Sequence, residues 1–106
     1  MPESDFERAA GALLAALEQA LEDCGAELDI EIAGEGMLEV GLRDGSKMVI
    51  NRHSAAREIW VAARSGGFHF RPIGTVWVDT RSGEELAALL VRLIREQTGE
   101  DARIAL

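Results

Sequence analysis

EIWVAAR, residues Glu58–Arg64, has the alternation expected of a β-strand with one buried side. Successive side chains of a strand point to opposite faces, so Ile59, Val61 and Ala63 belong together on one face. Trp60 then shares the other face with the charged ends of the segment. A tryptophan in phase with glutamate and arginine is predicted to face outward, as an apolar anchor of the kind that dominates many protein interfaces.

Five more alternating runs accompany this segment: Glu27–Ile32, Met37–Leu42, Lys47–Arg52, Gly67–Phe70 and a weaker one at Thr75–Asp79. Turn signals separate them, including an Asp-Gly pair at residues 44–45 that is typical of a tight hairpin. Together they predict one antiparallel sheet of five to six strands.

The alternation also predicts which side chains face inward in the run Glu27–Ile32, and it bears on the orientation of Trp77. The first run is predicted to turn Leu28, Ile30 and Ile32 inward and its three acids outward. Trp77 alternates with two valines, which leaves two interpretations open. It lies on the outer face with Trp60, or it is a partly covered structural tryptophan.

An amphipathic helix is predicted on each side of the sheet segments. Ser4–Glu7 and Ser82–Glu85 both match the capping-box pattern of a helix start. The apolar spacing predicts a first helix over about Asp5–Asp23 and a second with the stripe Leu86–Ile94, ending before Gly99. Neither helix can bury its stripe alone. The expected fold is therefore an α+β two-layer sandwich, with both helices on one face of the antiparallel sheet and the other face in water.

Composition predicts a soluble globular protein. The 106 residues predict a single domain over residues 1–106, and 47% hydrophobic with 28% charged residues is ordinary for such a domain. The single cysteine, Cys24, excludes an internal disulfide and a Cys-based zinc site. The longest apolar run, Ala9–Leu17, is far shorter than the ~20 residues that span a bilayer, and the acidic start is unlike a signal peptide. We expect a cytoplasmic protein without a membrane anchor.

The net charge of −8 is concentrated in the first part of the chain. Residues 1–42 hold eleven acids and one base, whereas the remainder has a small positive excess. Such a field repels nucleic acid and attracts cations or basic protein surfaces. Six carboxylates are predicted to form an open acidic ridge: Glu18, Glu22, Asp23, Glu27, Asp29 and Glu31. Carboxylate oxygens suit hard cations, and without EF-hand spacing the expected binding is weak and exchangeable. The alternative is a solubilising surface with no ligand.

No catalytic residue is predicted. The sequence lacks a Gly-rich phosphate loop, a Ser-His-Asp arrangement and a zinc pattern. His53 and His69 are expected to be isolated surface or turn residues, and Cys24 a small apolar filler at a helix end.

Five segments carry a resemblance to a known family: Gly45–Arg52, Ile59–Trp60, Gly66–Phe70, Trp77 with Asp79, and Arg81–Glu84. The chain resembles the frataxin family over Phe6–Gly99, most closely the bacterial branch. The predicted helix-sheet-helix order agrees with the family's fold.

The resemblance implies an iron-dependent regulator of iron–sulfur cluster assembly, rather than an enzyme. It implies weak, exchangeable binding of Fe²⁺ or Fe³⁺ along the acidic ridge. It also implies docking on a cysteine desulfurase and a cluster scaffold protein through Asn51, Arg52 and Trp60, by a protein that we expect to be monomeric. Gln19, His53 and Glu58 depart from residues that are frequent in the family.

Two other functions stay open. One is a ferroxidase, or an iron-storage or iron-donor protein, although the Glu-x-x-His pattern of a di-iron centre is missing. The other is an acidic interaction domain without a metal.

Overall fold

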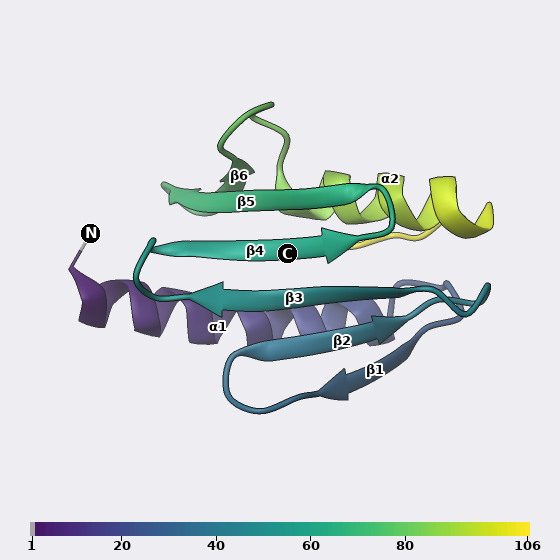
Figure 1. The fold of residues 1–106 in the computed structure, drawn as a ribbon, viewed down its shortest axis with the longest axis horizontal. Coiled ribbons are helices and arrows are strands. Elements are labelled where there is room, and N and C mark those ends of the chain that lie inside the picture. Colours follow the sequence, from purple (N-terminus) through teal and green to yellow (C-terminus); the bar gives the residue numbers. More distant parts are fainter. Residues whose placement is uncertain (1) are drawn as a thin grey trace.

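The computed structural model describes residues 2–106 and places both helices on one side of a six-stranded antiparallel sheet (Figure 1). The elements are α1 Glu3–Glu22, β1 Asp29–Ile32, β2 Met37–Gly41, β3 Lys47–His53, β4 Glu58–Ala63, β5 Gly66–Ile73, β6 Val76–Asp79 and α2 Leu86–Thr98. Each strand pairs with its neighbour in the chain, so the sheet order is β1-β2-β3-β4-β5-β6. The predicted two-layer α+β sandwich is confirmed.

The core lies between the helices and one face of the sheet. Helix α1 contributes the stripe Phe6, Ala10, Leu13, Leu14, Leu17 and Leu21, and α2 contributes Leu86, Leu89, Leu90, Leu93 and Ile94. The sheet meets them with Leu38, Val40, Met48, Ile50, Ile59, Val61 and Phe70. Cys24 is only 2% exposed, as expected of a small filler. In the C-terminal tail Ile104 packs on this core, whereas Leu106 remains exposed.

The N-terminal capping box is not formed. Helix α1 begins at Glu3, so Ser4 lies inside the first turn, and the N-cap Pro2 makes no side-chain cap. The backbone carbonyl of Pro2 accepts a hydrogen bond from the Phe6 N–H at 3.0 Å. The fixed φ of proline favours a helix start here. The earlier start places Glu3 and Asp5 in the first turn, where their charge is favourable to the helix dipole.

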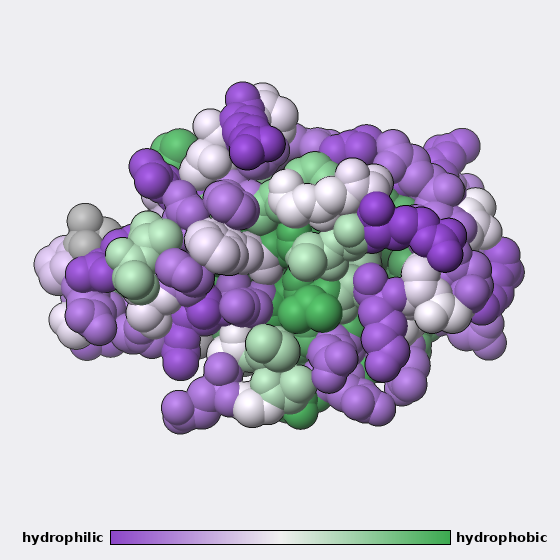
Figure 2. Space-filling model, in the orientation of Figure 1, coloured by the Kyte–Doolittle hydropathy of each residue, from purple (hydrophilic) through white to green (hydrophobic). Residues whose placement is uncertain are grey.

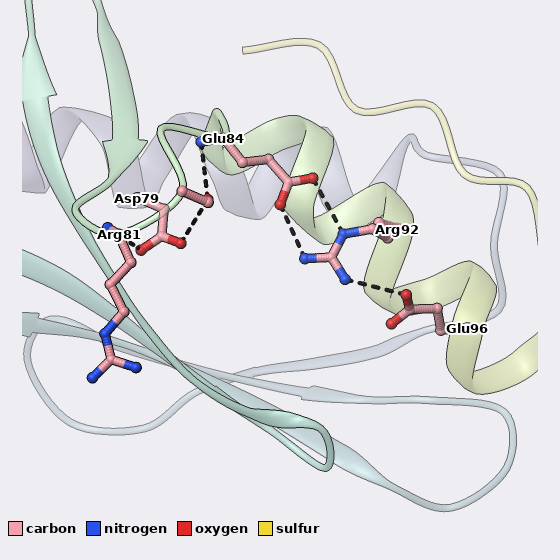
Figure 3. Close-up of polar contacts among 6 residues, drawn as sticks. Asp79, Arg81, Glu84, Arg92 and Glu96 are labelled. Carbon is pink, nitrogen blue, oxygen red and sulfur yellow. Dashed lines mark hydrogen bonds and ion pairs between the residues drawn. The ribbon is translucent and has the colours of Figure 1, made fainter.

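Ser82 is used in a turn rather than as the cap of α2, which starts at Leu86 without a side-chain cap. Its hydroxyl donates to Oδ2 of Asp79 at 2.8 Å and accepts from the Glu84 N–H at 3.1 Å (Figure 3). The backbone N–H of Arg81 donates to Oδ1 of Asp79. Burial raises the pKa of Asp79, but these hydrogen bonds outweigh it and the pKa is lowered. A buried ionised carboxylate therefore organises the turn before α2.

Arg92 links that turn to the helix. Its guanidinium donates twice to Glu84, at 3.0 and 3.2 Å, and once to Glu96, at 3.1 Å (Figure 3). The carboxylates of Glu84 and Glu96 raise the pKa of Arg92 above its ordinary value. Glu84 thus stabilises the start of α2 through an arginine two turns later.

Two apolar side chains differ from expectation. Trp77 lies on the helix side of the sheet, where its ring meets Phe6 edge-on with centroids 6.1 Å apart. The placement of Trp77 beside Trp60 is therefore wrong, and the interpretation as a covered structural tryptophan holds. Ile32 faces the helix side but is 64% exposed, because it ends an edge strand that borders an open groove beside α1.

Candidate functional site

The face of the sheet turned away from the helices carries two parallel cross-strand rows. The first, called here the tryptophan row, consists of Met37, Asn51, Trp60 and His69, which are in register on β2 to β5. The second, called the small-residue row, consists of Val49, Ala62 and Gly67, in register on β3 to β5. The placement of Trp60 on the open face is confirmed.

The indole of Trp60 is held between two imidazoles. The ring of His53 stacks on one face with centroids 3.8 Å apart, and the ring of His69 stacks on the other at 4.5 Å. Both interplanar angles are 10°. The sequence analysis treated both histidines as isolated, and the stack shows that this was wrong. The available signal was at His69, which directly precedes the buried Phe70 and therefore points to the open face. Trp60 is consequently a half-buried, oriented ring rather than a bare one.

The carboxylate of Glu58 holds the indole of this stack in place by a hydrogen bond. Glu58 is only 6% exposed although it lies on the open face. Its Oε1 accepts the indole N–H of Trp60 at 2.8 Å, and its Oε2 accepts Nε–H of Arg71 at 2.8 Å. Nδ1 of His69 lies 3.6 Å from Oε1. Burial raises the pKa of Glu58, but the hydrogen bonds from Trp60 and Arg71 and the nearby positive charge outweigh it, so the pKa is lowered.

Asn51 and Arg52, predicted to share this face, lie on opposite sides of β3. Asn51 is beside Trp60, and its Oδ1 is buried without a hydrogen-bond partner among residues 2–106. Arg52 points to the helix side, where Nη1 lies 3.0 Å from Oε2 of Glu7 on α1. Its placement on the Trp60 face is therefore wrong. The period of two that turns Met48 inward does the same for Arg52.

The acidic ridge is open and does not converge on one point. Its six carboxylates lie on the last turns of α1, in the following loop and on the outer side of β1, and all but the half-buried Glu18 are exposed. Within residues 2–106 no group of three or more His, Cys, Asp and Glu side chains is arranged to hold a metal ion. The sequence missed Glu39, which lies directly opposite Glu31 on β2. Its alternation within Met37–Leu42 was the available signal.

A shallow hollow of about 160 Å³ lies on the open face beside Trp60. The residues of the small-residue row line it, together with Asn51, Trp60 and His69. Figure 2 shows an apolar area in the middle of this face, surrounded by hydrophilic side chains. Such an arrangement suits contact with another protein more than chemistry, because a small apolar centre with a polar rim is typical of protein interfaces.

Within residues 2–106, neither helix combines the length and apolar character that crossing a membrane requires.

Comparison with known proteins agrees with the fold. The model of the frataxin-like domain family matches residues 1–100. A protein of Dechloromonas aromatica is 51% identical over 100 residues, covering 94% of this chain and 95% of its own. One of Cupriavidus pinatubonensis is 47% identical over 100 residues, covering 92% and 90%. Both bear the name iron-sulfur cluster assembly protein CyaY.

Solved structures show the same architecture. Frataxin from Psychromonas ingrahamii, of the CyaY protein family, has a TM-score of 0.89 and 28% identity, with full coverage of both chains. Trimeric yeast frataxin, complexed with ferrous iron, has a TM-score of 0.64 at 24% identity, covering 94% of this chain and 88% of its own. At that identity the yeast protein supports the fold alone. With the family model spanning nearly the whole sequence, the chain belongs to the frataxin family, in the CyaY branch of its bacterial relatives.

Proposed function

We propose that this protein takes part in iron–sulfur cluster assembly in the cytoplasm, as an iron-dependent regulator that docks on a cysteine desulfurase and its scaffold protein. The observation that carries the proposal is the fixed Trp60 ring on an uncovered sheet face. The names of the CyaY relatives support the process in which it acts. No arrangement of catalytic groups is needed for this role, which is one of binding.

Trp60 and Asn51 are proposed to form the centre of the docking face. Trp60 is held on both faces and by its N–H, so little side-chain entropy is lost when a partner covers it. Asn51 lies beside Trp60, and its buried Oδ1 lacks a hydrogen-bond partner among residues 2–106, so a turn of the amide would be needed before that oxygen meets a docking partner. Arg52 can contribute only after its ion pair with Glu7 opens, so we propose a smaller share of the binding energy for it.

Iron is proposed to bind weakly along the acidic ridge. Exposed carboxylates that do not converge provide one or two oxygen ligands at a time, and water completes the coordination. Such sites exchange readily, and an ion bound there removes negative charge from the surface. Iron can thereby change the attraction between the ridge and a basic patch of the desulfurase.

A binding assay with and without Fe²⁺ tests the proposal. The protein is immobilised and titrated with the desulfurase–scaffold complex under anaerobic conditions. The expected result is binding of the wild type that changes on adding Fe²⁺. It should be lost when Glu18, Glu22 and Asp23 are all replaced by lysine. The matched control replaces Glu3, Asp5 and Glu35 by lysine, which changes the net charge equally at exposed positions outside the ridge. Equal affinity of the two triple variants would contradict the role of the ridge.

Trp60→Ala tests the sheet face separately. Its expected effect is a binding loss of about tenfold or more, typical of a central aromatic anchor. Thermal unfolding measured alongside distinguishes lost docking from lost folding. Unchanged binding by a folded Trp60→Ala variant would remove the face from the proposal.

A further inference from the structure

We propose that the hollow beside Trp60 receives one aliphatic side chain of the docking partner, and that a basic side chain of the same partner segment meets Glu39 and Glu31. This inference rests on the proposed function and specifies the chemistry of the partner at its docking face. Trp60, Asn51 and Glu31 were predicted from the sequence, whereas Glu39 and the small-residue row lie outside that set.

The hollow results from a step between two rows of side chains. The tryptophan row is tall, because an indole stands on β4 with an imidazole on each side. In the neighbouring small-residue row, Val49, Ala62 and Gly67 are directly in register, and the side chains shrink from strand to strand. The small-residue row therefore forms a low, apolar floor, and Trp60 and His69 rise beside it as a wall. Figure 2 shows the apolar area in the middle of this face.

The size of the hollow decides what can occupy it. About 160 Å³ is well below the 300–1,000 Å³ typical of pockets for cofactors and drug-sized ligands. A floor of valine, alanine and glycine offers no charge to a metal or phosphate. A single aliphatic side chain fits this volume and surface, and burying it removes apolar area from water on both partners.

The charges beside the hollow indicate on which side of it a basic side chain of the partner lies. The small-residue row continues in register to Glu39 on β2 and Glu31 on β1, so two carboxylates face each other across the strands. Like charges directly opposite are unfavourable, and neither forms an ion pair within residues 2–106. On the other flank Arg71 is already paired with Glu58. Among the charges in register with the hollow, the two without an ion pair within residues 2–106 are therefore negative, and both lie on its β1–β2 side. Lys47, two positions before Val49 on β3, is an unpaired base of the neighbouring row.

Strand spacing sets the separation that the partner must match. Neighbouring strands lie ~4.8 Å apart, so Glu39 is about 10 Å from Ala62 across two spacings. The partner segment is expected to carry a lysine or arginine about 10 Å from its aliphatic side chain. Binding of such a segment relieves the repulsion between Glu39 and Glu31.

Filling the hollow tests the first half of the proposal. A Cβ added at Gly67 meets nothing within 4 Å and the backbone there is not left-handed, so Gly67→Val should fold. Ala62→Leu fills the floor from the adjacent strand. The matched control is Ala88→Leu on the exposed side of α2. Against the desulfurase–scaffold complex, each filling variant should weaken binding about tenfold, with the control within about twofold of wild type.

Charge reversal tests the second half. Glu39→Lys should lower affinity and flatten its salt dependence, since one attractive charge pair becomes repulsive. Glu35→Lys, in the loop between β1 and β2, makes the same charge change away from the row and is the control.

The outcomes separate this proposal from the one it rests on. If Trp60→Ala weakens binding while folded Gly67→Val and Ala62→Leu bind like wild type, the hollow is not occupied and this proposal is overturned, whereas docking through the face stands. If Glu39→Lys matches Glu35→Lys, the basic side chain is overturned. Failure of the wild-type protein to bind the complex at all overturns both the docking function and this inference.

Discussion

Trp60 donates its indole N–H to Oε1 of Glu58 across 2.8 Å, from two positions later on the same strand. In a flat strand these side chains would simply be neighbours on one face. Here the carboxylate is buried and also accepts a hydrogen bond from Nε–H of Arg71. The orientation of the proposed docking residue is therefore coupled to the ionisation of a buried acid.

This coupling predicts an acid-sensitive contribution to stability. The pKa of Glu58 is lowered from 4.5 in the folded protein, so its contribution is fully present above that value and is lost as the pH falls through the folded pKa. Glu58→Gln should destabilise the protein at neutral pH by ~1–3 kcal/mol, near the lower end because Arg71 is largely exposed. Urea unfolding at several pH values measures this. The wild type should lose stability on acidification more steeply than Glu58→Gln, and parallel curves would contradict the assignment.

The His53–Trp60–His69 stack predicts a shielded tryptophan ring. Trp77 is first replaced by phenylalanine so that the fluorescence comes from Trp60 alone. Quenching of this emission by acrylamide should be weak for a partly exposed indole, because an imidazole covers each ring face.

Single His53→Ala and His69→Ala variants serve as the controls for the stack. Each should increase the quenching, because one ring face is uncovered, and the double variant should increase it most. Unchanged quenching in a folded double variant would contradict the stack.

The ion pair between Arg52 and Glu7 predicts a small coupling energy. The side chains are 25% and 33% exposed, so solvent screens the pair and its worth should be below ~1 kcal/mol. A double-mutant cycle with Arg52→Met and Glu7→Gln measures it. Ser54 also donates to Glu7, so the single Glu7 variant should be the more destabilising of the two. A coupling energy near zero would mean that the pair does not tie β3 to α1 in solution.

Iron oxidation offers a separate measurement. With Fe²⁺ at one or two equivalents, oxygen consumption should be no faster than for the same Fe²⁺ without protein, because carboxylates spread along a ridge do not hold two ions next to each other. Oxygen uptake accelerated by the protein, and abolished by the triple lysine variant of Glu18, Glu22 and Asp23, would favour the ferroxidase alternative instead.

Strand periodicity predicted more of this fold than any other signal. It separated the two faces of β4 correctly, because Ile59 and Val61 share one phase and Trp60 shares the other with charged Glu58. The same rule, applied to β3, places Arg52 in phase with the buried Met48. The family resemblance had instead grouped Arg52 with Trp60, and that placement was wrong. For Trp77 the rule was misleading, since the polar Asp79 shares its phase and two valines take the other face, yet Asp79 is buried and Val76 is exposed. What holds Trp77 on the helix side is its edge-on contact with the ring of Phe6, which is far away in the sequence.

Contacts that depend on tertiary structure were beyond the sequence. The stacking of His53 and His69 on Trp60 requires the register of three strands, and lone histidines carry no periodic signal. The capping boxes failed for a different reason. Helix α1 begins two residues early, directly after Pro2, and the hydroxyl of Ser82 donates to the buried Asp79. Local patterns describe what a side chain can do, and competing partners determine what it does.

The order of strands has a consequence for how this molecule reaches its native state. Because every strand pairs only with the next one along the chain, the sheet can grow hairpin by hairpin through short loops. The one step that joins distant parts of the polypeptide is the arrival of α1 and α2, from opposite ends, on a shared apolar surface. The rate-limiting event of folding is therefore expected there, and core substitutions in the helices should slow refolding more than substitutions at the hairpin turns.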